Sequence, residues 1–302
     1  MSNKIAILLA TYNGEKYLNE QLQSIIGQTH TDWHLYVRDD GSTDATVSIL
    51  KGFEARFENI TVLDNLGEYT GSAAGNFFKL VHSSNYENFS HISFSDQDDV
   101  WAPKKLEAAL SCMESEGAQG YSSNLVSYDN KMKRANYIDK SQPQKEFDYL
   151  FQGGSAGCTY VISREVCLLV QKMTSGIDSY KGQSHDWLIY AICRVHDVSW
   201  CFDTEAHIFY RQHASNVYGS MSALSGAIAK FNMLRSGWYR NNVIWIARKS
   251  GADVKAASVF NHVVRNTLTD RLSLMKMSSL FRRNKKESRL LAIIFLFFFN
   301  KV

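Results

Sequence analysis

The sequence lacks the marks of several protein classes. It has two prolines in 302 residues, no Cys-x-x-Cys pair, and a formal net charge of only +3. So small a charge does not favour nucleic acid as a partner. An odd number of cysteines without metal spacing predicts reduced, mostly buried thiols in a cytoplasmic protein rather than disulfides or a structural metal site. The five cysteines are Cys112, Cys158, Cys167, Cys193 and Cys201.

Long hydrophobic runs are also missing. The first one, Ile5–Ala10, is too short for the apolar core of a signal peptide, so we expect no signal peptide. No run approaches the ~20 apolar residues that a membrane-spanning helix needs. The longest is at 290–299, which as a helix is about 15 Å long and cannot cross a bilayer alone.

Short apolar runs alternate with helical patterns through the first third of the chain. Strands are expected at Ile5–Leu9, 33–37, Ile60–Leu63 and Ile92–Phe94, with a helix between each pair. This alternation predicts an α/β fold with a mostly parallel sheet. Beyond 117 the pattern changes, and short strands are expected at 199–202 (SWCF) and 206–210 (AHIFY).

The length allows one large domain with an appendage. We expect a catalytic domain at 1–220, with halves at 1–116 and 117–220. The region 221–302 shows only amphipathic helical segments and is expected to be a helical C-terminal extension.

Polar clusters follow each of the first four expected strands. Because ligands collect at the carboxyl ends of parallel strands, these clusters predict one shared site. Its candidate residues are Thr11, Tyr12, Asn13 and Glu15 after the first strand, Asp39 and Asp40 after the second, Asn65 after the third, and Asp96, Asp98 and Asp99 after the fourth.

The last cluster puts three carboxylates within four positions. Like charges this close repel and raise one another's pKa unless a positive charge lies between them. The motif is either a solvated loop with a helix-capping aspartate, or a site for Mg²⁺ or Mn²⁺ that also holds a phosphate group. The order of the other loops favours the cation site.

Two more groups of residues bear on the chemistry. Asp186 is either a helix cap or a general base for an attacking hydroxyl. Arg211, His213 and Ser215 form either a surface basic loop or a phosphate site, with His213 as a nitrogen ligand of the cation. At the second strand, a carboxylate of Asp39 or Asp40 can accept an N–H from a nucleobase, and Tyr12 either stacks on that base or merely packs.

Six motifs together resemble the family 2 glycosyltransferases of the GT-A fold, a Rossmann-like α/β fold that binds nucleotide-diphospho-sugars. In order, they are TYNGEKYL, RDDGSTD, NLG, SDQDDVW, HDW and YRQHASN, over about residues 4–218. The pattern is similar to the bacterial branch of rhamnosyltransferase-like enzymes that build cell-surface polysaccharides. The sequence QGGSAGCT at 152–159 departs from that pattern, so the sugar is left open.

The resemblance implies an inverting, metal-dependent sugar transfer from a UDP- or dTDP-sugar to a hydroxyl. It implies that Tyr12, Glu15, Asp40 and Asn65 hold the nucleotide, that Asp96 touches the ribose or sugar side, and that Asp98 binds Mn²⁺ or Mg²⁺. Asp186 is then the base, while Arg211, His213 and Ser215 close over the diphosphate. Two alternatives remain: a sugar-nucleotide-binding subunit without turnover, and a sugar-nucleotide pyrophosphorylase.

The end of the chain suggests a partner. The basic residues Arg282, Arg283, Lys285, Lys286 and Arg289 precede the apolar run at 290–299. This arrangement favours peripheral attachment to the anionic inner face of the cell membrane, where a lipid-linked glycan acceptor would be found. The alternative is a helix buried in the core or in a homo-oligomer contact.

Overall fold

The structure is a computed structural model that describes residues 3–83, 86–129, 135–177, 179–213, 236–297 and 299. Its contacts divide the chain into two compact units. The first comprises Met1–Ser141, Ser155–Asp186 and Val198–Arg211. The second comprises Gln142–Gly154, Trp187–Asp197 and Gln212–Val302. The expected division at residue 220 falls outside the described residues and stays a prediction.

The first unit is built on a sheet whose first strand is buried at every position. Strand β1 (Ile5–Thr11) pairs in parallel with β2 (Trp33–Asp39) and β4 (His91–Ser95), and β2 pairs in parallel with β3 (Ile60–Leu63). Uninterrupted apolar runs suit strands that are covered on both faces. The structure confirms the expected α/β fold and its parallel strands.

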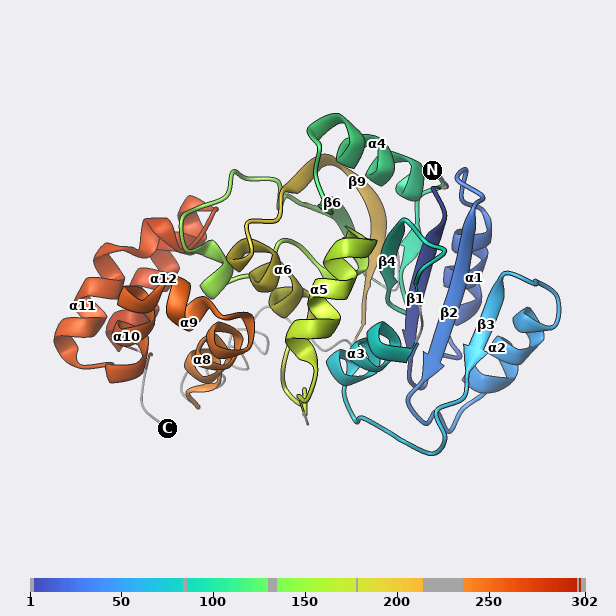
Figure 1. The fold of residues 1–302 in the computed structure, drawn as a ribbon, viewed down its shortest axis with the longest axis horizontal. Coiled ribbons are helices and arrows are strands. Elements are labelled where there is room, and N and C mark those ends of the chain that lie inside the picture. The colour runs from blue at the N-terminus through green and yellow to red at the C-terminus, as the bar shows by residue number, and fades with distance from the viewer. Residues whose placement is uncertain are drawn as a thin grey trace. The chain divides into compact units, whose positions relative to one another are not determined.

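Three helices connect these strands: α1 (Leu18–Ile26), α2 (Thr46–Glu54) and α3 (Ala73–Ser83). Parallel crossovers are right-handed. The chain moves outward from β1 to β3 and then back to β4, so α1 and α2 lie on one face of the sheet and α3 on the other (Figure 1). All the carboxyl ends of these strands therefore meet at one edge.

Antiparallel strands extend the sheet, which within the described residues has the order β3-β2-β1-β4-β8-β6-β9-β5, with β7 paired to β6. The added elements are β5 (Val100–Trp101), α4 (Lys105–Glu116), β6 (Gly120–Asp129), β7 (Ala135–Ile138), the 3₁₀ turn η2 (Gly157–Thr159), β8 (Val161–Ser163), α5 (Arg164–Thr174), α6 (His185–Val195) and β9 (Trp200–Gln212).

Two sequence expectations here were wrong or incomplete. The two short strands expected at 199–202 and 206–210 are one strand, β9, because Asp203 does not start a turn. Its carboxylate instead accepts hydrogen bonds from the hydroxyl of Tyr121 at 3.0 Å and from the backbone N–H of Glu205 at 2.8 Å. Helix α5 was missed, although Ser163 caps it through the N–H of Val166.

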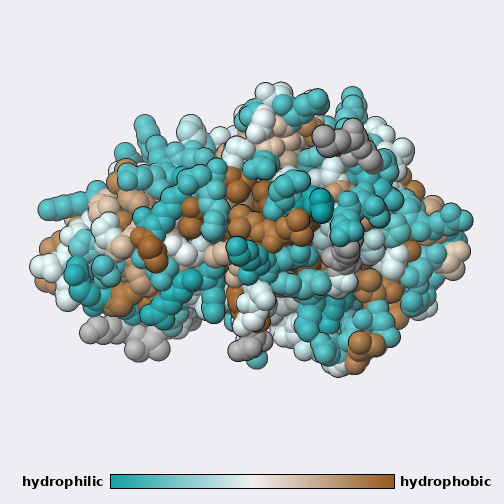
Figure 2. All heavy atoms as spheres, in the orientation of Figure 1, coloured by the Kyte–Doolittle hydropathy of each residue, from teal (hydrophilic) through white to brown (hydrophobic). Residues whose placement is uncertain are grey.

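The second unit is helical in its described part, as expected for the C-terminal region. It contains η1 (Asp148–Leu150), α8 (Trp238–Ser250), α9 (Ala252–Lys255), α10 (Ala257–Arg265), α11 (Leu268–Lys276), η3 (Ser278–Leu280) and α12 (Lys285–Phe297). Aromatic rings form its core: Phe281 lies 4.4 Å from Phe151 and 5.8 Å from Phe295, centroid to centroid. Over these helices, Figure 2 shows hydrophobic and hydrophilic residues interspersed at the surface.

The C-terminal helix α12 is neither wholly buried nor wholly exposed. Leu291, Ile294 and Phe295 pack inward, whereas Leu290 and Phe297 are 57% and 65% exposed. Arg283, expected in a basic flank, is buried. No helix within the described residues is long and apolar enough to cross a membrane. All five cysteines are free thiols, and four of them are buried.

Candidate active site

The loops after β1 and β2 are held together by side chains of the first motif. The carboxylate of Glu15 accepts the N–H of Ala45 at 2.8 Å, and the amide oxygen of Asn13 accepts the N–H of Thr43 at 2.8 Å. Both side chains, expected to touch a nucleotide, therefore already brace the start of α2 in this structure.

Asp39 builds the turn that follows β2. Its Oδ1 accepts hydrogen bonds from the hydroxyls of Thr11 at 2.8 Å and Ser42 at 2.6 Å. Its Oδ2 accepts the backbone N–H groups of Gly41 at 3.0 Å and Ser42 at 2.7 Å. Gly41 has φ +90°, a conformation that favours glycine. Asp39 therefore stabilises the turn that borders the site, and its contact with a nucleobase stays a prediction.

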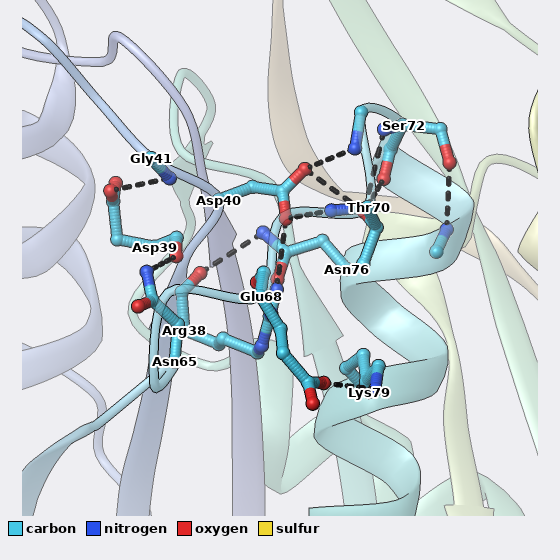
Figure 3. A network of polar contacts seen from close by, with 12 residues as sticks. Arg38, Asp39, Asp40, Gly41, Asn65, Glu68, Thr70, Ser72, Asn76 and Lys79 are labelled. Carbon is cyan, nitrogen blue, oxygen red and sulfur yellow. Dashed lines mark hydrogen bonds and ion pairs between the residues drawn. The ribbon is translucent and has the colours of Figure 1, made fainter.

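Asp40 is equally well bonded, as Figure 3 shows. Its Oδ1 accepts from Arg38 at 2.9 Å and from the N–H of Thr70 at 2.8 Å. Its Oδ2 accepts from the Thr70 hydroxyl at 2.9 Å and from the N–H of Gly71 at 2.8 Å. A carboxylate offers about four lone-pair positions. A nucleobase N–H that reaches Asp40 must therefore replace one of these donors.

The loop after β3 supplies an aromatic ring that the sequence reading missed. Asn65 fixes this loop, because its amide donates to the carbonyl of Asp39 at 2.9 Å and its oxygen accepts the N–H of Gly67 at 3.0 Å. A Cβ on Gly41 would lie 2.7 Å from the ring of Tyr69. Tyr69 and Tyr12, 64% and 56% exposed, are the large aromatic side chains that these loops offer to a ligand.

Gln97, the middle residue of the acidic motif, links that motif to the β1 loop. Its oxygen accepts the backbone N–H of Tyr12 at 2.8 Å, and its amide donates to the carbonyl of Tyr12 at 2.9 Å. A Cβ on Gly14 would lie 2.3 Å from the Gln97 oxygen, so glycine makes room for the pairing. No sequence pattern indicates this contact, since Tyr12 and Gln97 are 85 positions apart.

Asp96, Asp98 and Asp99, called the acidic lip below, lie directly after β4. Burial and the charges of Asp98 and Asp186 raise the pKa of Asp96 to about 8, and burial with the other two carboxylates raises that of Asp99 well above its usual value. Asp99 Oδ1 accepts the N–H of Arg211 at 3.2 Å, but Oδ2 has no hydrogen-bond partner among the residues that the structure describes. Crowded carboxylates with an unsatisfied oxygen fit a divalent cation.

Asp186 belongs to the same site. It lies in the first turn of α6, accepts a hydrogen bond from the hydroxyl of Ser184, and is close enough to Asp96 to affect its pKa. The preceding His185 stacks on Phe77 at 4.0 Å, and burial lowers the pKa of its imidazole.

Gly157 lets the segment before β8 approach His185 and Asp186 closely. A Cβ there would lie 2.3 Å from His185 Nε2 and 3.2 Å from the Cβ of Asp186. The segment 152–159, which departs from the family pattern, thus includes Gly157, whose backbone lies against the start of α6.

Arg211 holds the acidic lip in place. Its Nε donates to the carbonyl of Asp98 at 3.0 Å, its guanidinium forms an ion pair with Glu20, and it is 7% exposed. The expected contact with phosphate stays a prediction. His213 lies just after β9 and belongs to the second unit, so its role as a cation ligand also stays a prediction. Ser215 lies outside the described residues.

A parallel α/β sheet with an acidic lip at its carboxyl edge, and with Asp186 close enough to affect the pKa of Asp96, is the arrangement expected of a nucleotide-sugar transferase. The family model described as "Glycosyl transferase family 2" matches residues 6–163, which is more than half of the chain. The protein therefore belongs to this family. Among curated proteins, it is 36% identical over 251 residues to the dTDP-rhamnosyl transferase RfbG of Shigella flexneri, covering 81% of this chain and 85% of that one.

Two solved structures share the fold at low sequence identity. S. aureus TarS superposes with a TM-score of 0.58 at 15% identity, covering 97% of this chain and 80% of that chain. The mannosyltransferase PcManGT of Pyrobaculum calidifontis, solved with GDP-Man and Mn²⁺, gives 0.51 at 12% identity, covering 97% and 84%. The expected GT-A fold and glycosyltransferase activity are thus confirmed.

Proposed function

We propose that the protein is a metal-dependent, inverting transferase that moves rhamnose from dTDP-rhamnose to a hydroxyl of a growing cell-surface polysaccharide. The proposal for the donor follows the name of the RfbG relative. The proposal for the reaction depends on one observation: Asp186 lies within electrostatic range of the acidic lip.

Asp186 is proposed to act as the general base. An acceptor hydroxyl has a pKa far above physiological pH, so a carboxylate helps by taking its proton while the new bond forms. The anomeric carbon becomes oxocarbenium-like, and attack from the face opposite the nucleotide inverts it. The packing of His185 on Phe77 fixes the start of α6 and so limits the positions that Asp186 can take.

The residues proposed to hold the cation are Asp98 and His213, with Asp96 directed to the ribose or sugar. Bound Mn²⁺ or Mg²⁺ would neutralise charge on the leaving diphosphate. Arg211 donates its backbone N–H to the carboxylate of Asp99 and its Nε–H to the carbonyl of Asp98, and so helps the lip to keep its shape.

Donor and metal can be tested together. With dTDP-rhamnose and Mn²⁺ we expect release of dTDP, and with EDTA we expect that release to stop, because the crowded carboxylates cannot hold a diphosphate without a cation. The measurement is dTDP by chromatography, with UDP- and GDP-sugars as donor controls. Equal rates with and without EDTA would contradict the metal dependence, and preference for another donor would contradict dTDP-rhamnose.

Gln97 provides a second test. The variant Gln97→Ala loses two hydrogen bonds to the backbone of Tyr12, each worth about 0.5–1.5 kcal/mol. Because the ring of Tyr12 is then less well placed to stack on the nucleobase, we expect KM for the donor to rise by about 3- to 10-fold, in keeping with the loss of one or two such bonds. We expect kcat to change little. The control is Gln23→Ala, at an exposed position on α1. A fall in kcat with unchanged KM would contradict this role.

The second unit offers a surface for the proposed contact with the inner membrane face. Leu290, Ile293 and Phe297 are exposed and follow one another at helical spacing along α12. The exposed cations Lys285, Lys286 and Arg289 precede or adjoin them. A basic and apolar stripe of this kind binds anionic lipid surfaces, where a lipid-linked acceptor would be met.

This surface is tested by point changes, since truncation near residue 288 would also remove the core residues Leu291, Ile294 and Phe295. Replacing Leu290, Ile293 and Phe297 with glutamine is expected to abolish sedimentation with vesicles of anionic phospholipid and to leave the melting temperature unchanged. The matched control is Leu168→Gln, an exposed leucine of α5 in the first unit. Unaltered co-sedimentation of the triple variant would contradict the membrane contact.

A further inference from the structure

One buried group near the acidic lip has no part in the proposed reaction. Cys158, in η2, is completely buried, as is Asp99. The ligand atoms of Asp96, Asp99 and Cys158 all lie within 4.8 Å of one another. Nothing in the family resemblance requires a thiol at this position.

Two carboxyl groups and one lysine lie near the thiol of Cys158. Burial, together with Asp99 and Asp96, raises the pKa of Cys158 well above its usual value. The charge of Lys105 opposes this rise in the pKa of Cys158. The ammonium group of Lys105 donates a hydrogen bond to the hydroxyl of Ser93 and lies 3.7 Å from the ring centre of Trp101. The thiol of Cys158 lies within hydrogen-bonding distance of the Asp99 carboxyl, whose Oδ2 is buried and has no other hydrogen-bond partner in the described part of the chain.

We propose that Asp96, Asp99 and Cys158 form a second cation site, distinct from the one proposed at Asp98, that is selective for thiophilic ions such as Zn²⁺, Cd²⁺ and Co²⁺. Zinc binds oxygen at about 2.1 Å and sulfur at about 2.3 Å, so a shift of a few tenths of an ångström lets the three atoms share one ion. Thiolate ligands select such ions over Mg²⁺ and Mn²⁺. On binding, the S–H bond breaks, a metal–sulfur bond forms and the proton leaves to solvent.

Occupation of this site has a consequence for activity, which rests on the proposed function. Asp96 would be drawn to the inner ion and lost to the sugar nucleotide. Zn²⁺ is therefore expected to inhibit transfer even when Mn²⁺ is in excess. Loss of an outer-shell partner lowers metal affinity by about 10- to 100-fold. Removal of a direct ligand is expected to raise the Zn²⁺ concentration needed for inhibition by at least as much.

The site can be tested without turnover. Metal-free protein is titrated with Co²⁺, whose bond to a thiolate produces an intense near-ultraviolet charge-transfer band. The titrations use a Cys112→Ser background, because Cys112 lies within hydrogen-bonding distance of Cys201 and that pair could bind Co²⁺ as well. We expect a band that saturates at one equivalent and that added Zn²⁺ removes.

Three variants complete the experiment. Cys158→Ser should remove the band, with Cys158→Ala as a second variant if the serine protein fails to fold. Asp99→Asn should keep the thiol but weaken Co²⁺ binding, and Cys167→Ser, which removes another buried thiol, should change nothing. Absence of the band in the background protein, or its persistence in the Cys158 variants, would overturn the second site. Because no sugar nucleotide is present, that result is independent of the donor and metal tests above.

Discussion

Replacing Asp186 with asparagine is expected to lower the rate of sugar transfer by about 10²- to 10⁴-fold, the usual contribution of a general base. Asparagine keeps the size and the hydrogen bond from Ser184 but cannot take a proton from the acceptor. Donor binding should survive, because Asp186 is not needed to hold the nucleotide. The measurement is kcat for transfer, with dTDP binding by calorimetry in the presence of Mn²⁺.

The matched control is Asp197→Asn, just beyond the other end of α6, where the carboxylate is 86% exposed and paired with Lys255. It should transfer sugar at the wild-type rate. If Asp186→Asn retained full activity, Asp186 would not be the base. If the variant lost dTDP binding as well, its role would be to organise the donor site instead.

The largest expected effect on stability comes from Asp148 in the second unit. This carboxylate is fully buried and accepts a hydrogen bond from Tyr190 at 3.0 Å, and it forms ion pairs with Arg194 and, at 3.8 Å, with Arg283. Asp148→Ala removes a carboxylate that two guanidinium groups share. Breaking a buried ion pair in this way costs about 3–5 kcal/mol.

We therefore expect Asp148→Ala to unfold at a much lower urea concentration than the wild type. The control is Asp197→Asn, which removes the exposed ion pair with Lys255 and suits the φ of +57° at this position, so it should cost little. Arg283 also donates to the carbonyl of Gly153 at 3.0 Å, so the glycine-rich loop should loosen along with the helices. An unchanged midpoint for Asp148→Ala would show that the two arginines find other partners.

The sequence predicted what depends on local pattern. The apolar run at Ile5–Leu9 could only be a buried strand, and the polar clusters after four strands indicated one edge and one site. Contacts between distant segments were not predictable. Gln97 meets Tyr12, and Gly157 meets His185, through backbone geometry that no spacing rule encodes. Arg283 was expected in a basic flank facing an anionic membrane, but it is buried beside Asp148, which lies far away in sequence.

The bonding of Asp39 and Asp40 affects how an anionic ligand can approach. Each carboxylate is enclosed by donors from its own chain, so neither presents a bare charge to an incoming diphosphate. Under the proposed function, the charge left for a bound cation to neutralise is therefore that of the carboxylates directly after β4.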